Sequence, residues 1–63
     1  MLIEGKKAYH KVLESWCVVI SVNYKSFDSD EIISYDVSMN GIPIPGIQPF
    51  NLLTEEQYIM TII

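Results

Sequence analysis

The sequence contains no arginine and only four lysines, against eight aspartate and glutamate residues, which gives a formal net charge of -4. Proteins bind nucleic acids through clustered lysine and arginine side chains, and arginine is the residue best suited to phosphates and base edges. The charge balance therefore argues against direct binding of DNA or RNA. It favours a protein partner with a basic surface.

Cysteine and long apolar runs are equally scarce. Cys17 is the only cysteine, so the chain cannot form an intrachain disulfide and differs from disulfide-rich secreted miniproteins. No run of about 18 apolar residues is present, as a membrane-spanning helix requires, and the first residues lack the apolar core of a signal peptide. We therefore expect a cytoplasmic protein that makes no contact with a membrane.

The apolar content, 49% of 63 residues, is that of a globular protein, and the length allows one domain over residues 1–63. A chain this short buries only about 60% of its unfolded surface, so its core is small. We expect a partner protein or a second subunit to add to its stability.

Residues 4–16 have the apolar spacing of a helix. Tyr9, Val12, Leu13 and Trp16 lie at positions i, i+3, i+4 and i+7, while Lys6, Lys7, Lys11 and Glu14 face outward. This pattern predicts a first helix of about two and a half turns, which depends on docking against a sheet because a helix that short is marginal alone.

From Trp16 the apolar period changes from that of a helix to two, the period of a strand. One predicted strand has Trp16, Val18, Ile20, Val22 and Tyr24 on its apolar face, and the next has Ile33, Tyr35, Val37 and Met39. Pairing Val22 with Ile33 brings Ile20 against Tyr35, Val18 against Val37 and Trp16 against Met39, so we expect that register.

Asn40-Gly41 predicts a tight hairpin turn, because both residues tolerate positive φ. A third strand then pairs Met39 with Ile42 and Val37 with Ile44. Pro43 and Pro45 fall opposite Ser38 and Asp36, where a missing N–H costs no hydrogen bond within the sheet, so this is expected to be an edge strand.

Residues 46–53 are expected to form a loop that crosses back over the apolar face. Thr54-Glu55-Glu56-Gln57 then matches a capping box and predicts a C-terminal helix, with Tyr58, Ile59, Ile62 and Ile63 facing inward and a short strand as the alternative. The predicted fold class is α+β: a helix, a three-stranded antiparallel meander and a second helix, with both helices on one face of the sheet.

Catalysis and metal binding have weak support. His10 and Glu14 lie four residues apart on the predicted first helix, but Cys17 is the only other soft donor and a structural zinc site needs four ligands. No lysine or arginine adjoins Cys17 to activate its thiol. We expect neither an enzyme nor a bound metal or cofactor.

Two surfaces are candidates for binding. The first is acidic and contains the aromatic Phe27, which either folds back under the sheet or stands exposed as an anchor for a partner. The second lies on the outer face of the sheet, where apolar residues interrupt the polar ones and where a homodimer could form. The first surface consists of Phe27, Asp28, Asp30, Glu31, Asp36, Glu55 and Glu56, and the second of Cys17, Val19 and Ile32.

These features predict a small acidic protein-binding module. We favour an inhibitor of the phage or mobile-element type, which blocks a basic site on a nucleic-acid-processing or host-defence protein. The alternative is a structural protein that forms a homo-oligomer or serves as a small subunit of a larger complex.

Overall fold

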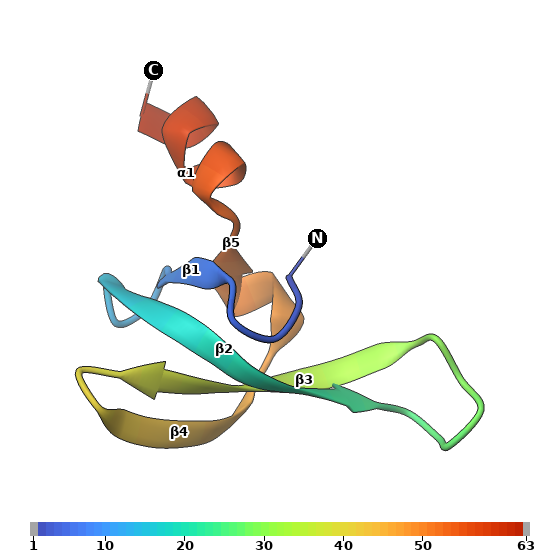
Figure 1. Ribbon diagram of the computed structural model, residues 1–63. Coiled ribbons are helices and arrows are strands. Elements are labelled where there is room, and N and C mark those ends of the chain that lie inside the picture. The colour runs from blue at the N-terminus through green and yellow to red at the C-terminus, as the bar shows by residue number, and fades with distance from the viewer. Residues whose placement is uncertain (1, 63) are drawn as a thin grey trace.

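The computed structural model describes residues 2–62 and shows a five-stranded antiparallel sheet with one C-terminal helix (Figure 1). The strand order in the sheet is β4-β3-β2-β1-β5. The elements are β1 (Lys7–His10), β2 (Ser15–Tyr24), β3 (Ile32–Met39), β4 (Ile42–Ile47), the 3-10 helix η1 (Pro49–Asn51), β5 (Leu52–Leu53) and α1 (Glu55–Ile62).

The predicted first helix is wrong. Residues 7–24 form a hairpin of β1 and β2, in which Tyr9 lies opposite Trp16. Their rings meet edge to face with centroids 5.3 Å apart, and such aromatic cross-strand pairs stabilise a sheet. The hairpin thus brings together two residues that the helical pattern would have stacked on one stripe.

The other two apolar residues of the predicted helix lie in the turn between β1 and β2. Val12 and Leu13 are exposed turn residues, and Glu14 has a positive φ of 51°. The N–H of Leu13 donates to Nδ1 of His10 over 3.1 Å, which closes the turn. Helical spacing at these positions therefore arises without a helix.

The meander of β2, β3 and β4 is confirmed, and the β3–β4 pairing follows the expected register near the turn. Met39 pairs with Ile42, and Val37 pairs with Ile44. Asn40 and Gly41 have φ values of 55° and 80°, as their hairpin turn requires. β4 is an edge strand, as its prolines predict.

The predicted β2–β3 register is wrong because β2 contains an extra residue. Val37 pairs with Val19 rather than Val18, and Tyr35 pairs with Val22, with a shift between Val19 and Ser21 that leaves Ile20 as the inserted residue. Such a β-bulge breaks the alternation of the strand. In the part of β2 before the bulge, Cys17 and Val19 therefore face the core, where the sequence pattern placed Trp16 and Val18.

The core lies on one face of the sheet and is completed by segments from both ends of the chain. Val19 and Val37 are its largest wholly buried side chains. The chain crosses back from β4 through η1 to β5, which pairs with β1. The buried apolar residues are Leu2, Ala8, Cys17, Val19, Tyr35, Val37, Met39, Ile47 and Leu52, together with the polar His10.

The N-terminal turn, which we define as residues 2–6, lies alongside β2. The N–H of Gly5 donates to the carbonyl of Val19 over 2.8 Å, and the N–H of Val19 donates to the carbonyl of Lys6 over 2.9 Å. These bonds extend the pairing of β1 with β2 by one residue beyond Lys7 and Val18. Past Val19, this side of β2 has no partner among residues 2–62.

The C-terminal segment is a helix rather than a strand, and its capping box is confirmed. Thr54 Oγ1 accepts from the N–H of Gln57 over 3.1 Å, while Gln57 Oε1 accepts from the N–H of Thr54 over 2.9 Å. Reciprocal bonds of this kind satisfy donors that the first helical turn leaves unpaired. The helix thus starts where the sequence predicts.

The expected packing of this helix on the apolar face is wrong. α1 stands away from the sheet in Figure 1, and none of its residues is buried. Only the half-buried Tyr58 packs closely, with its ring centroid 4.5 Å from that of Tyr9 and 4.9 Å from that of Trp16. Ile59 and Ile62 are exposed, and Ile63 lies outside the described residues.

Within residues 2–62 there is no helix with the length and apolarity to span a membrane.

We expect Thr54→Ala to unwind α1 without unfolding the sheet. The substitution removes the capping hydroxyl, which is worth about 1 kcal/mol, and α1 has little tertiary packing to compensate. In NMR spectra, backbone shifts of residues 55–62 should move toward random-coil values while those of β2 and β3 stay. Thr54→Ser is the control and should keep the helix, and loss of the sheet signals in Thr54→Ala would contradict the prediction.

Candidate protein-binding site

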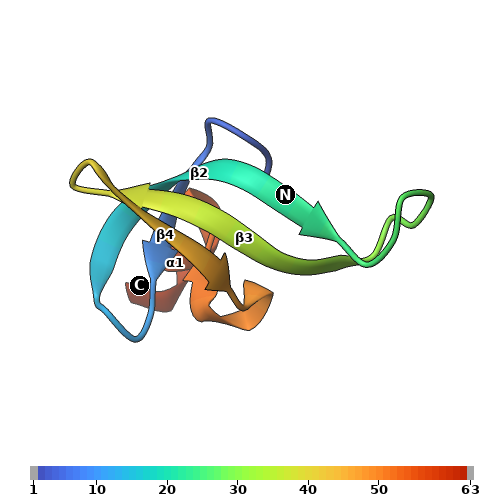
Figure 2. The same cartoon turned by 90° about the horizontal axis from the view of Figure 1, so that it is seen from below.

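β2 and β3 extend beyond their neighbours and form a two-stranded arm. β1 and the N-terminal turn accompany β2 only as far as Val19, and β4 accompanies β3 only up to Tyr35. Residues 20–24 therefore pair only with β3, and residues 32–34 pair only with β2. Figures 1 and 2 show this part of the hairpin projecting to one side of the molecule. The arm presents whatever lies at its end well clear of the rest of the fold.

Residues 25–31 form the loop at the end of the arm, which we call the tip loop. The N–H of Lys25 donates to the carbonyl of Glu31 over 2.8 Å, so the loop is closed at its base. Within it, the hydroxyl of Ser26 donates to Asp28 Oδ1 over 3.2 Å, and Ser29 Oγ accepts from the N–H of Glu31 over 3.0 Å. The loop is shaped by its own hydrogen bonds rather than by contacts with the core.

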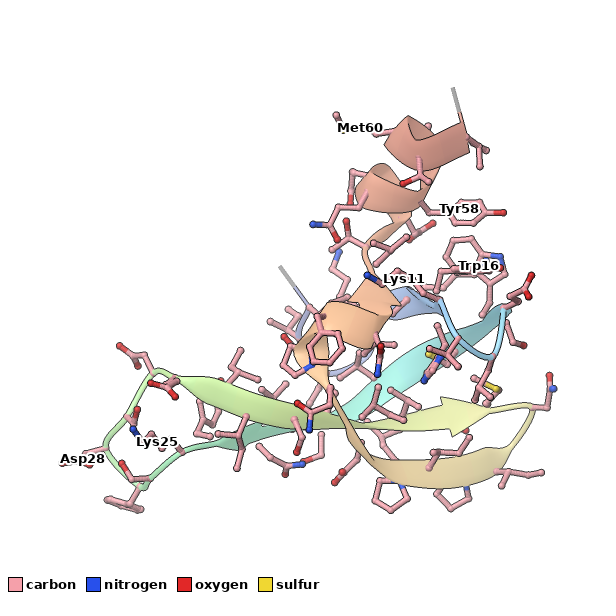
Figure 3. All side chains as sticks on the ribbon, turned by 180° about the vertical axis from the view of Figure 1, so that it is seen from behind. Lys11, Trp16, Lys25, Asp28, Tyr58 and Met60 are labelled. Carbon is pink, nitrogen blue, oxygen red and sulfur yellow. The ribbon has the colours of Figure 1, made fainter. Side chains whose placement is uncertain are left out.

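Phe27 is fully exposed, with a relative accessibility of 107%. Of the two alternatives for this residue, a side chain folded under the sheet and an exposed anchor, the structure shows the exposed one. Asp28, Asp30 and Glu31 are exposed around it, and only Lys25 in the same loop offsets their charge. Figure 3 shows Asp28 at the extreme end of the arm. The tip loop thus combines an exposed aromatic ring with a local excess of negative charge.

Asp36 lies apart from the tip loop and is already engaged within the fold. Its Oδ1 accepts from Asn23 Nδ2 over 3.0 Å and from the N–H of Gly46 over 3.1 Å. The side chain of Asn23 also donates to Ser34 Oγ over 3.0 Å. This half-buried carboxylate links β2, β3 and β4, so it holds the base of the arm in place.

Glu55 and Glu56 are exposed at the start of α1, which the two views place away from the tip loop (Figures 1 and 2). Hydrogen bonds from its own backbone N–H and from Thr54 lower the pKa of Glu56, desolvation opposes them with a smaller effect, and the charge of the nearby Lys6 adds a still smaller lowering. The structure therefore divides the predicted acidic surface: four residues share the tip loop, while Asp36 and the two glutamates lie elsewhere.

The predicted placement of Cys17, Val19 and Ile32 on the outer face of the sheet is wrong. Cys17 and Val19 are buried in the core, and Ile32 is half-buried against it. The cause is the bulge at Ile20, which puts Val19 and Val22 on the same side of the sheet. In the folded protein, Cys17 and Val19 cannot contribute to an interface.

His10 and Cys17 are likewise occupied by the fold. Nδ1 of the buried His10 accepts the hydrogen bond from Leu13, and the thiol of Cys17 donates to the carbonyl of Ala8 over 3.4 Å. Burial raises the pKa of the Cys17 thiol, which keeps it protonated and poorly nucleophilic. Among residues 2–62, no group of three or more His, Cys, Asp or Glu side chains is placed to hold a metal ion.

Tyr9, Trp16 and Tyr58 form an aromatic cluster that the sequence analysis did not predict. The three rings lie within 5.3 Å of one another by centroid, and Figure 3 shows Trp16 beside Tyr58. The ammonium group of Lys7 lies 4.8 Å from the centroid of Trp16. Desolvation raises the pKa of Tyr9, and the neighbouring Tyr58 adds to the effect. No local pattern in the sequence connects Tyr58 with Tyr9 and Trp16, so sequence reasoning missed this contact.

We expect the Cys17 thiol to react with a disulfide reagent only when the protein unfolds, on the order of a hundredfold more slowly in the native state than in denaturant. The matched control moves the thiol by one residue, in the double variant Cys17→Ala and Val18→Cys, because Val18 is exposed. That variant should react rapidly when folded. Equal native rates for the two proteins would contradict the burial of Cys17.

Comparisons of the chain with protein-family models, with curated proteins and with solved structures find no match.

Proposed function

We propose that this protein works by binding another protein, and that the tip loop makes the contact. The observation that carries the proposal is Phe27, a large apolar side chain that is wholly exposed between acidic neighbours at the end of a projecting arm. Burying an aromatic anchor in a pocket of a partner is a common source of binding energy. An exposed phenylalanine with no such role would only favour aggregation.

The acidic residues point to a partner with a basic surface. Asp28, Asp30 and Glu31 would meet lysine or arginine side chains around the pocket that receives Phe27. Basic clefts of this kind are typical of proteins that hold nucleic-acid phosphates. The narrow arm suits entry into such a cleft, so we favour an inhibitor of the phage or mobile-element type that blocks a nucleic-acid-processing or host-defence protein.

A non-enzymatic role agrees with the chemistry of the described residues. The thiol of Cys17 is buried with a raised pKa, and the imidazole of His10 is buried and hydrogen-bonded within the β1–β2 turn. The exposed groups of the tip loop are carboxylates, hydroxyls and one lysine, with no paired nucleophile and base among them. Binding is therefore the activity that we assign.

Charge reversal in the tip loop is the test, with an equal reversal on α1 as its control. Asp28→Lys with Asp30→Lys and Glu55→Lys with Glu56→Lys raise the formal net charge equally, from -4 to 0, since each substitution adds two units to the value of the parent chain. Each protein is used to capture partners from a nuclease-treated lysate of the organism that carries the gene, with elution by salt.

We expect the tip-loop variant to lose its basic partner at a much lower salt concentration than the parent, and the α1 variant to behave like the parent. Phe27→Ala should weaken binding by roughly thirtyfold, corresponding to about 2 kcal/mol for an aromatic anchor. Equal losses in both charge variants would show that only the total charge matters, and the tip-loop proposal would then fail.

A second candidate function is assembly into a larger complex through α1. This helix buries none of its residues and exposes Ile59, Met60 and Ile62, and an eight-residue helix gains most of its stability from packing. Figure 3 shows Met60 at the end of the helix remote from the sheet. A subunit that covered this helix would complete the apolar contact that the chain does not make itself.

For assembly, we expect a partner that stays bound at high salt and is lost in Ile59→Asp but not in Thr61→Asp. Both substitutions add one negative charge to exposed positions of the same helix, and only the first removes a large apolar side chain. The same capture experiment measures this. Loss of the partner with the tip-loop reversal instead would count against assembly.

A further inference from the structure

One edge of the sheet is open. From Ile20 to Tyr24, β2 has β3 on one side and, among residues 2–62, no strand or turn on the other. The segment Ile-Ser-Val-Asn-Tyr carries no charge and no proline, and its β-branched and aromatic residues favour strand pairing. Unprotected edges of this type readily accept another strand.

The direction of the backbone groups follows from the fold. Val19 points its side chain into the core and directs its N–H and C=O toward the N-terminal turn, away from β3. After the inserted Ile20, Val22 also packs against the core, so its N–H and C=O point to the same side as those of Val19. A second register shift lies between Asn23 and Tyr24, where the extra residue belongs to β3 and not to β2. Because the next residue, Lys25, donates its N–H across to the carbonyl of Glu31, Tyr24 directs its own N–H and C=O to the open side, as Val22 does. The open edge therefore presents the donors and acceptors of Val22 and Tyr24.

The other edges of the sheet are protected. β4 carries Pro43 and Pro45, and Pro43 lies opposite Ser38 at a position where an ordinary residue would direct its N–H outward. β5 has only two residues before the chain turns into α1. Short edge strands and prolines are the usual means of preventing further pairing. The segment Ile20–Tyr24 lacks both.

We propose that the open edge of β2 is the interface of a homodimer, in which β2 pairs antiparallel with β2 of a second copy. With Asn23 opposite Asn23 of the second copy, each Val22 exchanges a pair of backbone hydrogen bonds with Tyr24 of the other chain. All the outward groups of these residues are then satisfied. The two arms join into one continuous antiparallel sheet.

A second copy fits this edge better than another strand for two reasons. Antiparallel pairing about a two-fold axis lets the same edge serve as both partners, and it places Val22 across from Tyr24 in a β-branched–aromatic pair on the core side. Antiparallel pairing also places the two acidic tip loops at opposite ends of the joined arms. Each loop then lies toward the N-terminal turn of the other copy, where the positively charged Lys6 is exposed. Parallel pairing would bring the acidic loops together.

The dimer also supplies support that the arm lacks. An isolated two-stranded hairpin is marginally stable in water, and the arm has exposed apolar side chains at Ile20, Tyr24 and Ile33. Adding a strand on the open side of β2 makes each half of the arm part of a wider sheet. This inference goes beyond the proposed function, because it concerns the edge of β2 and not the tip loop.

The test is sedimentation equilibrium of the purified protein over a wide concentration range, at low and at high salt. We expect a dimer that persists at high salt, because backbone hydrogen bonds and apolar pairs hold it and the contact of the tip loop with Lys6 adds only a salt-dependent part. Tyr24→Pro removes an outward N–H that β3 does not use and should weaken the dimer at least about tenfold. Tyr24→Phe keeps the N–H and should leave the dimer unchanged, as should Ile59→Asp on the exposed helix.

Hydrogen exchange of the unmodified protein gives a second measurement that does not depend on how Tyr24→Pro folds. The amides of Val22 and Tyr24 should be protected at concentrations where the dimer forms and should lose that protection on dilution, while Val19 stays protected. A monomer at every concentration would overturn the proposal. So would a dimer in which the amides of Val22 and Tyr24 exchange freely, or one that Ile59→Asp dissociates.

Discussion

The inserted residue Ile20 is the feature on which the rest of the structure depends. It allows Val19 and Val22 to face the same side, so that the core continues from the centre of the sheet into the base of the arm, where Val22 lies opposite Tyr35. Without the insertion, one of these valines would face away from the core. A β-bulge also increases local twist, and β2 and β3 extend beyond the other strands as the arm (Figure 2). The bulge thus determines which side chains of β2 are buried.

The core of this fold is small, and many apolar side chains remain exposed outside it. Among residues 2–62, the largest side chains that are wholly buried are Val19 and Val37, whereas the arm, the β1–β2 turn and α1 all expose apolar residues. Short chains share this difficulty, because they have too little volume for the surface that they carry. Uncovered apolar groups lie on the arm, at the tip loop and the adjoining open edge, and on α1, which stands apart from the arm (Figure 1). A partner bound to the helix therefore need not exclude one bound to the arm.

Local signals in the sequence predicted the structure well, and long-range ones did not. The Asn40-Gly41 turn, the edge position of β4 and the capping box at Thr54 each depend on a few adjacent residues, and all are confirmed. The β2–β3 register was predicted wrongly because both faces of β2 contain apolar residues. The alternation of apolar and polar residues therefore gives no sign of a bulge. The first helix was predicted wrongly because Tyr9 and Trp16 can contact each other across a hairpin as well as along one face of a helix. Of the candidate site, the sequence could name the tip-loop residues, but the exposure of Phe27 depends on the length of an arm that only the structure defines.

The contact between Trp16 and Tyr58 has a practical consequence. Trp16 is the chain's one tryptophan, and the ring of Tyr58 lies 4.9 Å from it, so the only aromatic side chain on α1 rests on the residue that dominates the intrinsic fluorescence. Because α1 touches the sheet mainly through this ring, detachment of the helix would change the polarity around the indole before the core is disturbed. The emission spectrum of the unlabelled protein is therefore a built-in optical signal for the position of its C-terminal helix.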